Sequence, residues 1–349
     1  MQEITFRKPS DLHVHFRDGP MLAAVVPYTA RDFRHALVMP NLVPPVTTTA
    51  MAAAYRERIM AAVPEGVDFT PLMTCYLTDD TDAGDLVAGF RDGVTVGAKL
   101  YPAHATTNSQ HGVTDIRNIR DVLAAMADAG MPLLTHGERV RPDIDVFDRE
   151  KFFIDEILVP TLEEIPTLRV VMEHITTADG ALAARSFGDR VAATITPQHL
   201  LFNRNALFEG GLRPHLYCLP VLKREEHRLA LRQAATSGLS NYLLGTDTAP
   251  HLRRDKEADC GCAGVFSAPV ALEAYLQVFE EENALDRFER FATLNGAAFY
   301  HLEVPQETVT YVRRERYVAE QIEVGDQSVI PLHAGKSVGW SKLGGGAGN

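Results

Sequence analysis

Cysteine is scarce in this chain of 349 residues, which contains four: Cys75, Cys218, Cys260 and Cys262. They are scattered, with one C-x-C pair and no C-x-x-C motif, so a disulfide framework is not indicated and reduced thiols are expected. Cys260 and Cys262 could form one arm of a zinc clip, but no partner thiolates lie nearby in the sequence, which favours an ordinary loop pair.

The chain also lacks long apolar runs and an excess of positive charge. No run approaches the roughly 20 residues that a membrane helix needs, and the N-terminal MQEITFRKPSDLHVHF lacks the apolar core of a secretory signal. We therefore expect a cytoplasmic protein with no membrane partner. The formal net charge is −12, without a stretch rich in lysine or arginine, so nucleic acid is not expected as a partner. A small anionic substrate would need a local site built from a few cations or metal ions.

A short pattern recurs along the chain: an apolar, β-branched run followed by an alanine-rich stretch compatible with a helix. The length, with 46% hydrophobic and 23% charged residues, suits two globular domains or one large α/β barrel. The intervening stretches, for example residues 50–62, 115–129 and 223–237, carry helical periodicity. The apolar runs number eight, at residues 11–15, 36–40, 69–77, 95–101, 132–136, 169–174, 191–196 and 242–246.

Strands that alternate with helices imply βαβ units and a parallel sheet, and eight of them predict an α/β fold closed into a (β/α)8 TIM-like barrel. The alternative, an open doubly wound sheet, usually has a glycine-rich phosphate turn after its first strand, and none follows the first run here. Two more helical stretches are predicted at 267–282 and 286–301. We expect one domain over residues 1–349, with a small extension of strands and loops from about residue 304 and a flexible GGGAGN terminus.

Metal-ligand residue types collect where the predicted strands end, which is the edge that carries the active site in such barrels. His13 and His15 end the first run, His136 the fifth and His174 the sixth, and Asp247 follows the eighth. His13 and His15 are two apart on a strand, so both side chains leave the same face and can reach one metal. Singly, each histidine could be a polar residue of the core or the barrel mouth. Together with the aspartate they predict a metal site.

Lys99 lies inside the apolar fourth run, where an ammonium group would be buried at high cost. It must therefore be paired with an acidic group, be neutral, or be modified. A neutral amine can capture carbon dioxide as a carbamate, a bidentate anion able to bridge two metal ions. A Schiff-base lysine is the remaining alternative, but that chemistry needs no histidines, and four stand at the neighbouring strand ends.

The predicted ligand set holds two metal ions. His13, His15 and Asp247 serve one, His136 and His174 the other, and carboxylated Lys99 bridges them. Imidazole and carboxylate oxygen suit zinc, and two zinc ions can share a hydroxide whose pKa is near neutral. Asp247 is predicted to be catalytic, accepting the proton of that hydroxide and returning it to a leaving nitrogen.

These residues match a known family. H-x-H on the first strand, lysine on the fourth, histidines on the fifth and sixth and aspartate on the eighth resemble the amidohydrolase superfamily. Within it, several strings resemble the class II dihydroorotases over nearly the whole chain: DLHVHFRD (11–18), MPN (39–41), GAKLYP (97–102), LTHGE (134–138) and GTDTAPH (245–251). The resemblance implies the reversible, zinc-dependent cyclisation of N-carbamoyl-L-aspartate to L-dihydroorotate plus water, in de novo pyrimidine biosynthesis. It also implies a homodimer.

The resemblance implies substrate-binding residues as well. Arg17, Asn41 and His251 would hold the substrate carboxylate, for which an arginine fork is well suited. Arg17 could instead pair with Asp18 at the surface, Asn41 could be a turn residue after Pro40, and His251 could be a loop residue.

Two further sets of contacts follow from the same resemblance. Backbone groups near Leu219 and Ala263 would bind the amides of the substrate ring. The polar segment 103–112 would be a lid whose Thr106 and Thr107 bind substrate and exclude water. The alternative is an ordinary mobile loop.

Two other functions compete with this interpretation. A hydantoinase- or allantoinase-like cyclic amidase would use the same metals on another ring, but the strings around Arg17, Asn41 and His251 argue against it. A non-catalytic scaffold of the same superfamily would have lost metal ligands, whereas all six ligand positions are filled here.

Overall fold

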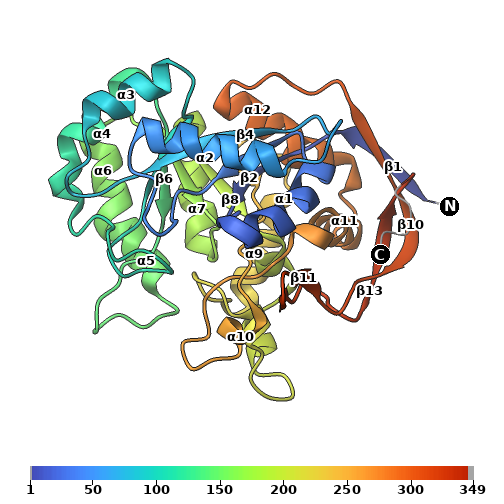
Figure 1. The fold of residues 1–349 in the computed structure, drawn as a ribbon. Coiled ribbons are helices and arrows are strands. Elements are labelled where there is room, and N and C mark those ends of the chain that lie inside the picture. Colours follow the sequence, from blue (N-terminus) through green and yellow to red (C-terminus); the bar gives the residue numbers. More distant parts are fainter. Residues whose placement is uncertain (1, 345–349) are drawn as a thin grey trace.

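The computed structural model describes residues 2–344 and contains an eight-stranded parallel sheet in the order β2-β3-β4-β5-β6-β7-β8-β9 (Figure 1). Its strands are β2 (Ser10–Val14), β3 (His35–Val38), β4 (Thr70–Tyr76), β5 (Gly97–Leu100), β6 (Leu133–His136), β7 (Val170–Glu173), β8 (Val191–Ile195) and β9 (Tyr242–Leu244). The end of β9 approaches β2, where Asp247 N donates to His13 O at 2.9 Å and His15 N donates to Thr248 O at 2.9 Å. The sheet therefore comes close to closing on itself. The predicted (β/α)8 barrel is confirmed: six strands lie inside the ranges expected from the sequence, and β2 and β3 each begin one residue before theirs.

Helices follow the strands and cover the outside of the barrel (Figure 1). The α-helices are α1 (Gly19–Asp32), α2 (Thr49–Ala62), α3 (Ala83–Arg91), α4 (Arg120–Ala129), α5 (Arg149–Phe153), α6 (Val159–Glu164), α7 (Ala178–Ser186), α8 (Pro197–Leu201), α9 (Glu225–Ala235), α10 (Arg253–Lys256), α11 (Ala271–Glu281) and α12 (Asn295–Tyr300). Side-chain oxygens begin several of them: Thr48 accepts from Met51 N at α2, and Thr177 from Gly180 N at α7. Such caps satisfy amides that have no partner in the first helical turn.

The apolar core has an inner and an outer part, because each strand of a barrel has one inward and one outward face. The inner cluster takes a residue from most strands, for example Leu12, Leu72, Leu134 and Leu243, and Phe299 on α12 joins it. The outer cluster packs the opposite strand faces against the helices. Strands buried on both faces read as nearly continuous apolar runs, which explains why the sequence revealed all eight.

A second sheet lies beside the barrel and joins the two ends of the described chain (Figure 1). Its order is β1 (Glu3–Arg7), β10 (Thr308–Tyr317) and β13 (Ser337–Lys342), all antiparallel, and a hairpin of β11 (Ile322–Val324) and β12 (Gln327–Val329) accompanies it. Strands in the C-terminal segment were expected, whereas β1 was not predicted. Most of the GGGAGN terminus lies outside the described residues. No helix within residues 2–344 is long and apolar enough to cross a membrane.

Candidate functional site

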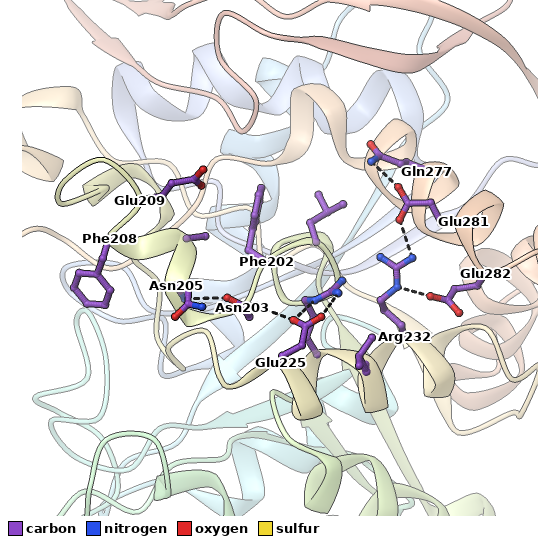
Figure 2. A pocket seen from close by; sticks show the side chains of 14 residues that line it. Phe202, Asn203, Asn205, Phe208, Glu209, Glu225, Arg232, Gln277, Glu281 and Glu282 are labelled. Atoms are coloured by element: carbon purple, nitrogen blue, oxygen red, sulfur yellow. Dashed lines mark hydrogen bonds and ion pairs between the residues drawn. The ribbon is translucent and has the colours of Figure 1, made fainter.

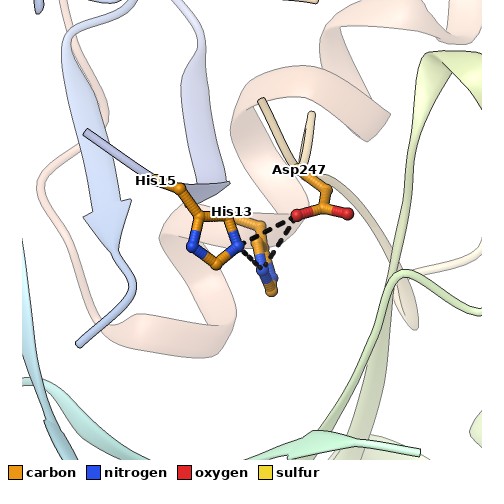
Figure 3. A group of neighbouring side chains, drawn as sticks. All are labelled: His13, His15 and Asp247. Atoms are coloured by element: carbon orange, nitrogen blue, oxygen red, sulfur yellow. Dashed lines mark hydrogen bonds and ion pairs between the residues drawn. The ribbon is translucent and has the colours of Figure 1, made fainter. Parts of the chain in front are cut away.

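Three ligand atoms converge where β2 and β9 meet (Figure 3). The Nε2 atoms of His13 and His15 are 3.3 Å apart, and Asp247 Oδ1 lies 3.5 Å from the first and 3.1 Å from the second. All three residues are buried. Tetrahedral zinc with bonds of about 2.0–2.1 Å separates its ligand atoms by roughly 3.3 Å, so this spacing fits one metal ion.

The hydrogen bonds of the two imidazoles leave their Nε2 lone pairs free. His13 Nδ1 lies 2.8 Å from Glu173 Oε2, and His15 Nδ1 lies 2.8 Å from Asn41 Oδ1. When each Nδ1 donates to its oxygen, each Nε2 can only accept. Two ring nitrogens and one carboxylate oxygen then face one another without a donor between them, and a cation is what satisfies such a group.

The second pair of predicted ligands lies directly beside this triad. The ring centre of His174 is 4.9 Å from that of His13 and 4.9 Å from that of His136. His136 Nε2 bonds Glu138 Oε2 at 2.7 Å, which leaves Nδ1 as its available ligand atom. His174 Nδ1 is buried and has no hydrogen-bond partner within residues 2–344. The four predicted histidines therefore form one continuous group.

Lys99 is completely buried, and its Nζ has no hydrogen-bond partner among the described residues. Burial lowers the pKa of its amine to about 8, although the carboxylates of Glu173 and Asp247 act in the opposite direction. Burial, followed by the positive charge of Lys99, holds the pKa of His13 and of His174 well below the usual range. The alternative in which Lys99 pairs with an acidic group finds no support among the ion pairs of residues 2–344. An uncompensated ammonium in this place is costly, whereas a neutral amine or an anionic carbamate beside metal ions is not.

Asp247 remains a carboxylate in spite of its burial. Burial alone would raise its pKa, but the contact with the His15 imidazole and the neighbouring His13 imidazole lower it to about 2. The backbone of Asp247 has a φ of 46°, in the left-handed region that non-glycine residues rarely adopt. Arg17, at 61°, and His174, at 41°, share this property. Such strain concentrates at functional sites, where the surrounding structure enforces it.

Gly245 allows β9 to come close enough to complete the triad. A Cβ atom at this position would lie 2.7 Å from Thr194 Cβ and 3.1 Å from His13 Cβ. A side chain here would push β9 away from both neighbours, and Asp247 would move with it.

A small cavity opens over the ligand group. Its lining contains most of the predicted metal ligands and most of the predicted substrate-binding residues. These are His13, His15, Arg17, Asn41, Thr106, Thr107, His136, His174, Leu219, Asp247 and Ala263, and Tyr101, Ala249 and Gly264 complete the lining. Lys99 and His251 are absent from the lining. Lys99 Nζ lies 5.3 Å from the ring centre of Tyr101, which lines the cavity, and His251 contacts Arg17.

Arg17 is held toward the cavity. Its Nε donates to Pro250 O at 3.1 Å, and one terminal nitrogen lies 2.9 Å from His251 Nε2. The alternative pairing with Asp18 is wrong, since Asp18 pairs with Arg58 at 2.9 Å. Arg17 therefore keeps donor capacity for an anionic ligand.

Asn41 connects the ligand group to the segment 103–112. Its Oδ1 bonds His15, and its Nδ2 donates to Thr107 O at 3.2 Å. Asn108 Nδ2 returns a bond to Asn41 O at 3.0 Å, and Tyr76 hydroxyl donates to Asn108 O. The predicted lid thus lies over the cavity and is tied to it by these hydrogen bonds.

Three buried carboxylates that sequence reasoning missed support the ligands. Glu173 bonds His13, Glu138 bonds His136, and Asp11 accepts from Thr246 N at 2.8 Å and from its hydroxyl at 2.6 Å. Burial raises the pKa of Asp11 and of Glu173 to about 7. Partners of this kind orient metal ligands and fix their tautomers. Asp11 had a usable signal, because it precedes His13 by two residues and shares its strand face.

Two other features of the surface, a cysteine pair and an open groove, do not contribute to the metal-ligand group at the barrel mouth. Cys260 and Cys262 have sulfurs 3.4 Å apart on an exposed loop, and neither belongs to a group of three metal-ligating side chains among the described residues. A larger, open groove lies between α8, α9 and α11, and its charged side chains pair with each other, for example Arg232 with Glu281 and Glu282 (Figure 2). Among the described residues, the group of three metal-ligating side chains lies at the barrel mouth.

Comparison with known proteins agrees with this geometry. Residues 10–305 match the amidohydrolase family. Dihydroorotase of Erythrobacter litoralis is 59% identical over 339 residues, covering 97% of this chain and 98% of that protein. The structure of dihydroorotase from Campylobacter jejuni has a TM-score of 0.89 at 35% identity, covering 98% of this chain and 97% of that chain. Dihydroorotase from Saccharomyces cerevisiae, in complex with 5-fluoroorotic acid, has a TM-score of 0.90 at 31% identity, covering 98% of each chain. The chain therefore belongs to the amidohydrolase family and, within it, to the dihydroorotases.

Proposed function

We propose that the cavity at the barrel mouth catalyses the reversible cyclisation of N-carbamoyl-L-aspartate to L-dihydroorotate and water, a step of pyrimidine biosynthesis. The observation that carries this proposal is the meeting of three metal-ligating atoms at the floor of a cavity that Arg17 also lines. Metal ions suit the hydrolysis of an amide, and a guanidinium suits the free carboxylate of this substrate.

We propose two zinc ions per chain. His13, His15 and Asp247 would hold one and His136 and His174 the other, with N6-carboxylated Lys99 bridging them. The support lies in the donor set and in the completely buried, unpartnered Nζ of Lys99. When bound, zinc lowers the pKa of water toward neutrality and polarises a carbonyl group.

Asp247 would carry the proton that is transferred in the reaction. In ring opening, water adds to the ring carbonyl and the bond to the ring nitrogen breaks. Asp247, ionised in its ground state, accepts the proton of the attacking water and delivers it to the leaving nitrogen. In ring closure the same carboxylate carries the proton in the opposite direction.

Substrate binding would use the rest of the cavity. Arg17, Asn41 and His251 would hold the carboxylate, and the backbone at Leu219 and Ala263 would bind the ring amides. Thr106 and Thr107, on the segment over the cavity, would bind substrate and exclude water. We also propose that the chain acts as a single domain with an extension from about residue 304, in a cytoplasmic homodimer.

The decisive experiment follows ring opening of L-dihydroorotate by its loss of ultraviolet absorbance, on protein whose zinc has been counted. We expect turnover that a chelator abolishes and about two metal ions per chain. Two bound metals without turnover would refute the substrate and favour a hydantoin-like ring. A chain that binds no metal would favour the scaffold.

The bridging role of Lys99 has a separate test. We expect Lys99→Ala to lose turnover and one or both metal ions, and we expect added short-chain carboxylic acids to restore part of each. Near-normal turnover and metal content without added acid would contradict the carbamate bridge.

A further inference from the structure

A second buried lysine, Lys256 at the end of α10, has a different environment from Lys99. It is 3% exposed, and its Nζ donates to three backbone carbonyls: Tyr217 O at 2.8 Å, Cys262 O at 2.7 Å and Gly264 O at 2.8 Å. An ammonium group has three donors and no acceptor, so all of its hydrogen-bonding capacity is used. The Nζ also lies 5.6 Å from the centre of the Tyr217 ring.

The three carbonyls belong to two adjacent loops that both contribute to the cavity wall. Tyr217 stands two residues before Leu219, in the loop that follows β8. Cys262 and Gly264 flank Ala263, in the loop that follows β9. Leu219, Ala263 and Gly264 all line the cavity. Lys256 therefore joins the two backbone segments that are expected to bind the substrate ring.

The backbone around this lysine leaves little freedom for other arrangements. Gly264 N donates to Tyr217 O at 2.9 Å, so one carbonyl receives both this amide and the lysine. Gly264 has a φ of 155°, and a Cβ atom there would lie 2.5 Å from Ala249 O. Gly264 consequently cannot carry a side chain unless the backbone that Lys256 contacts moves.

Stability alone does not account for a charge in this position. No carboxylate forms an ion pair with Lys256 within residues 2–344, and burial lowers the pKa of its amine to about 8. An apolar side chain of similar size would avoid the cost of desolvating an ammonium group. What an apolar side chain cannot do is hold three carbonyl oxygens at a fixed distance around one atom.

We infer that Lys256 is a positioning residue that sets the spacing of the Leu219 and Ala263 backbones in the cavity wall, and thereby the affinity for the substrate ring. It does not reach the ligand, because all three of its protons are used by the protein. The kinetic part of this inference rests on the proposed dihydroorotase reaction, whereas the structural part does not.

The first experiment needs no substrate. Hydrogen exchange at the Gly264 amide is compared in the parent protein, in Lys256→Met and in the control Lys336→Met, a variant of an exposed lysine. We expect exchange to be about tenfold faster in Lys256→Met and unchanged in the control, with the same zinc content in all three. Unchanged exchange in Lys256→Met would overturn the inference.

The second experiment separates positioning from a general loss of structure. We expect Lys256→Met to raise KM for L-dihydroorotate about tenfold while kcat stays within about threefold. In Lys256→Ala, which lacks the outer part of the side chain, propylammonium restores KM and 1-propanol does not. Equal effects of the two additives, or a loss of kcat with unchanged KM, would overturn the positioning role.

Two further results, a parent protein without turnover and a Lys256→Met variant that does not fold, have separate consequences. If the parent protein does not turn over L-dihydroorotate, the proposed function fails and the exchange experiment still decides the role of Lys256. If Lys256→Met does not fold, Lys256→Arg keeps a cation with several donors, and slow exchange at Gly264 in that variant supports the inference. Fast exchange there contradicts it.

Discussion

Replacing Glu173 by alanine tests whether the buried carboxylates tune the metal site. Glu173 is 2% exposed, and its Oε2 bonds both His13 Nδ1 at 2.8 Å and Thr194 hydroxyl at 2.6 Å. The variant leaves the imidazole of His13 without the partner that fixes its orientation and tautomer. A hydrogen bond to a charged group contributes about 1.5–3 kcal/mol, which corresponds to a factor of roughly 10–150 in affinity. We therefore expect zinc to bind Glu173→Ala about 10–100 times more weakly, in agreement with the general cost of losing such partners.

The measurement is a zinc titration of metal-free protein against a competing chromogenic chelator at pH 8. Glu173→Gln keeps an oxygen acceptor for His13, so its loss of affinity should be a few-fold only. Glu273→Ala is a matched control, because Glu273 is equally buried and bonds Arg316 at 2.8 Å, away from the site. It should lose stability but keep its affinity for zinc. Zinc affinity in Glu173→Ala equal to that of the parent protein would refute the reasoning.

Three further predictions concern other parts of the molecule. Gly245→Ala should lose zinc binding and at least about 2 kcal/mol of stability in chemical denaturation, because its Cβ would overlap Thr194 and crowd His13; normal zinc content would contradict this. Arg17→Met should lower kcat/KM for the acidic substrate about a hundredfold at unchanged metal content, and a loss of metal instead would make Arg17 a structural residue. Burial lowers the pKa of His35 to about 4, below its value of about 6.5 in the unfolded chain, so its contribution to stability is complete above pH 6.5 and is lost as the pH falls toward 4. His35→Gln should remove about 1–2 kcal/mol of that pH dependence in denaturation measured between pH 7 and pH 4, and an unchanged pH profile would contradict it.

Most of the barrel could be predicted from the sequence because its strands are buried on both faces. The resulting apolar runs are easy to recognise, and residues 69–77, for example, contain the strand Thr70–Tyr76. The strand β1 could not be recognised in this way. It has only a short, half-exposed pattern, and its partner β10 lies about three hundred residues further along the chain.

The candidate site also has residues that could be predicted from the sequence and residues that could not. The metal-ligand residue types were visible because strand ends of a barrel meet at one edge, so His13, His136 and Asp247 could be grouped without coordinates. Glu173 was not predicted, because strict alternation along β7 would place it on the face opposite His174. The φ of 41° at His174 breaks that alternation and lets both residues approach His13. Lys256 was missed for another reason: its partners are carbonyl groups, which every residue carries.

The junction between β9 and β2 has a consequence for how the protein acquires metal during synthesis. His13 and His15 leave the ribosome early, whereas Asp247 is added only after all eight barrel strands have been made. A nascent chain that ends before β9 carries the imidazoles without the carboxylate that meets them. We therefore expect metal uptake at this triad to be a late event, coupled to the docking of the last strand onto the first. The metal then links the beginning and the end of the barrel, and its release should loosen the structure first at this junction.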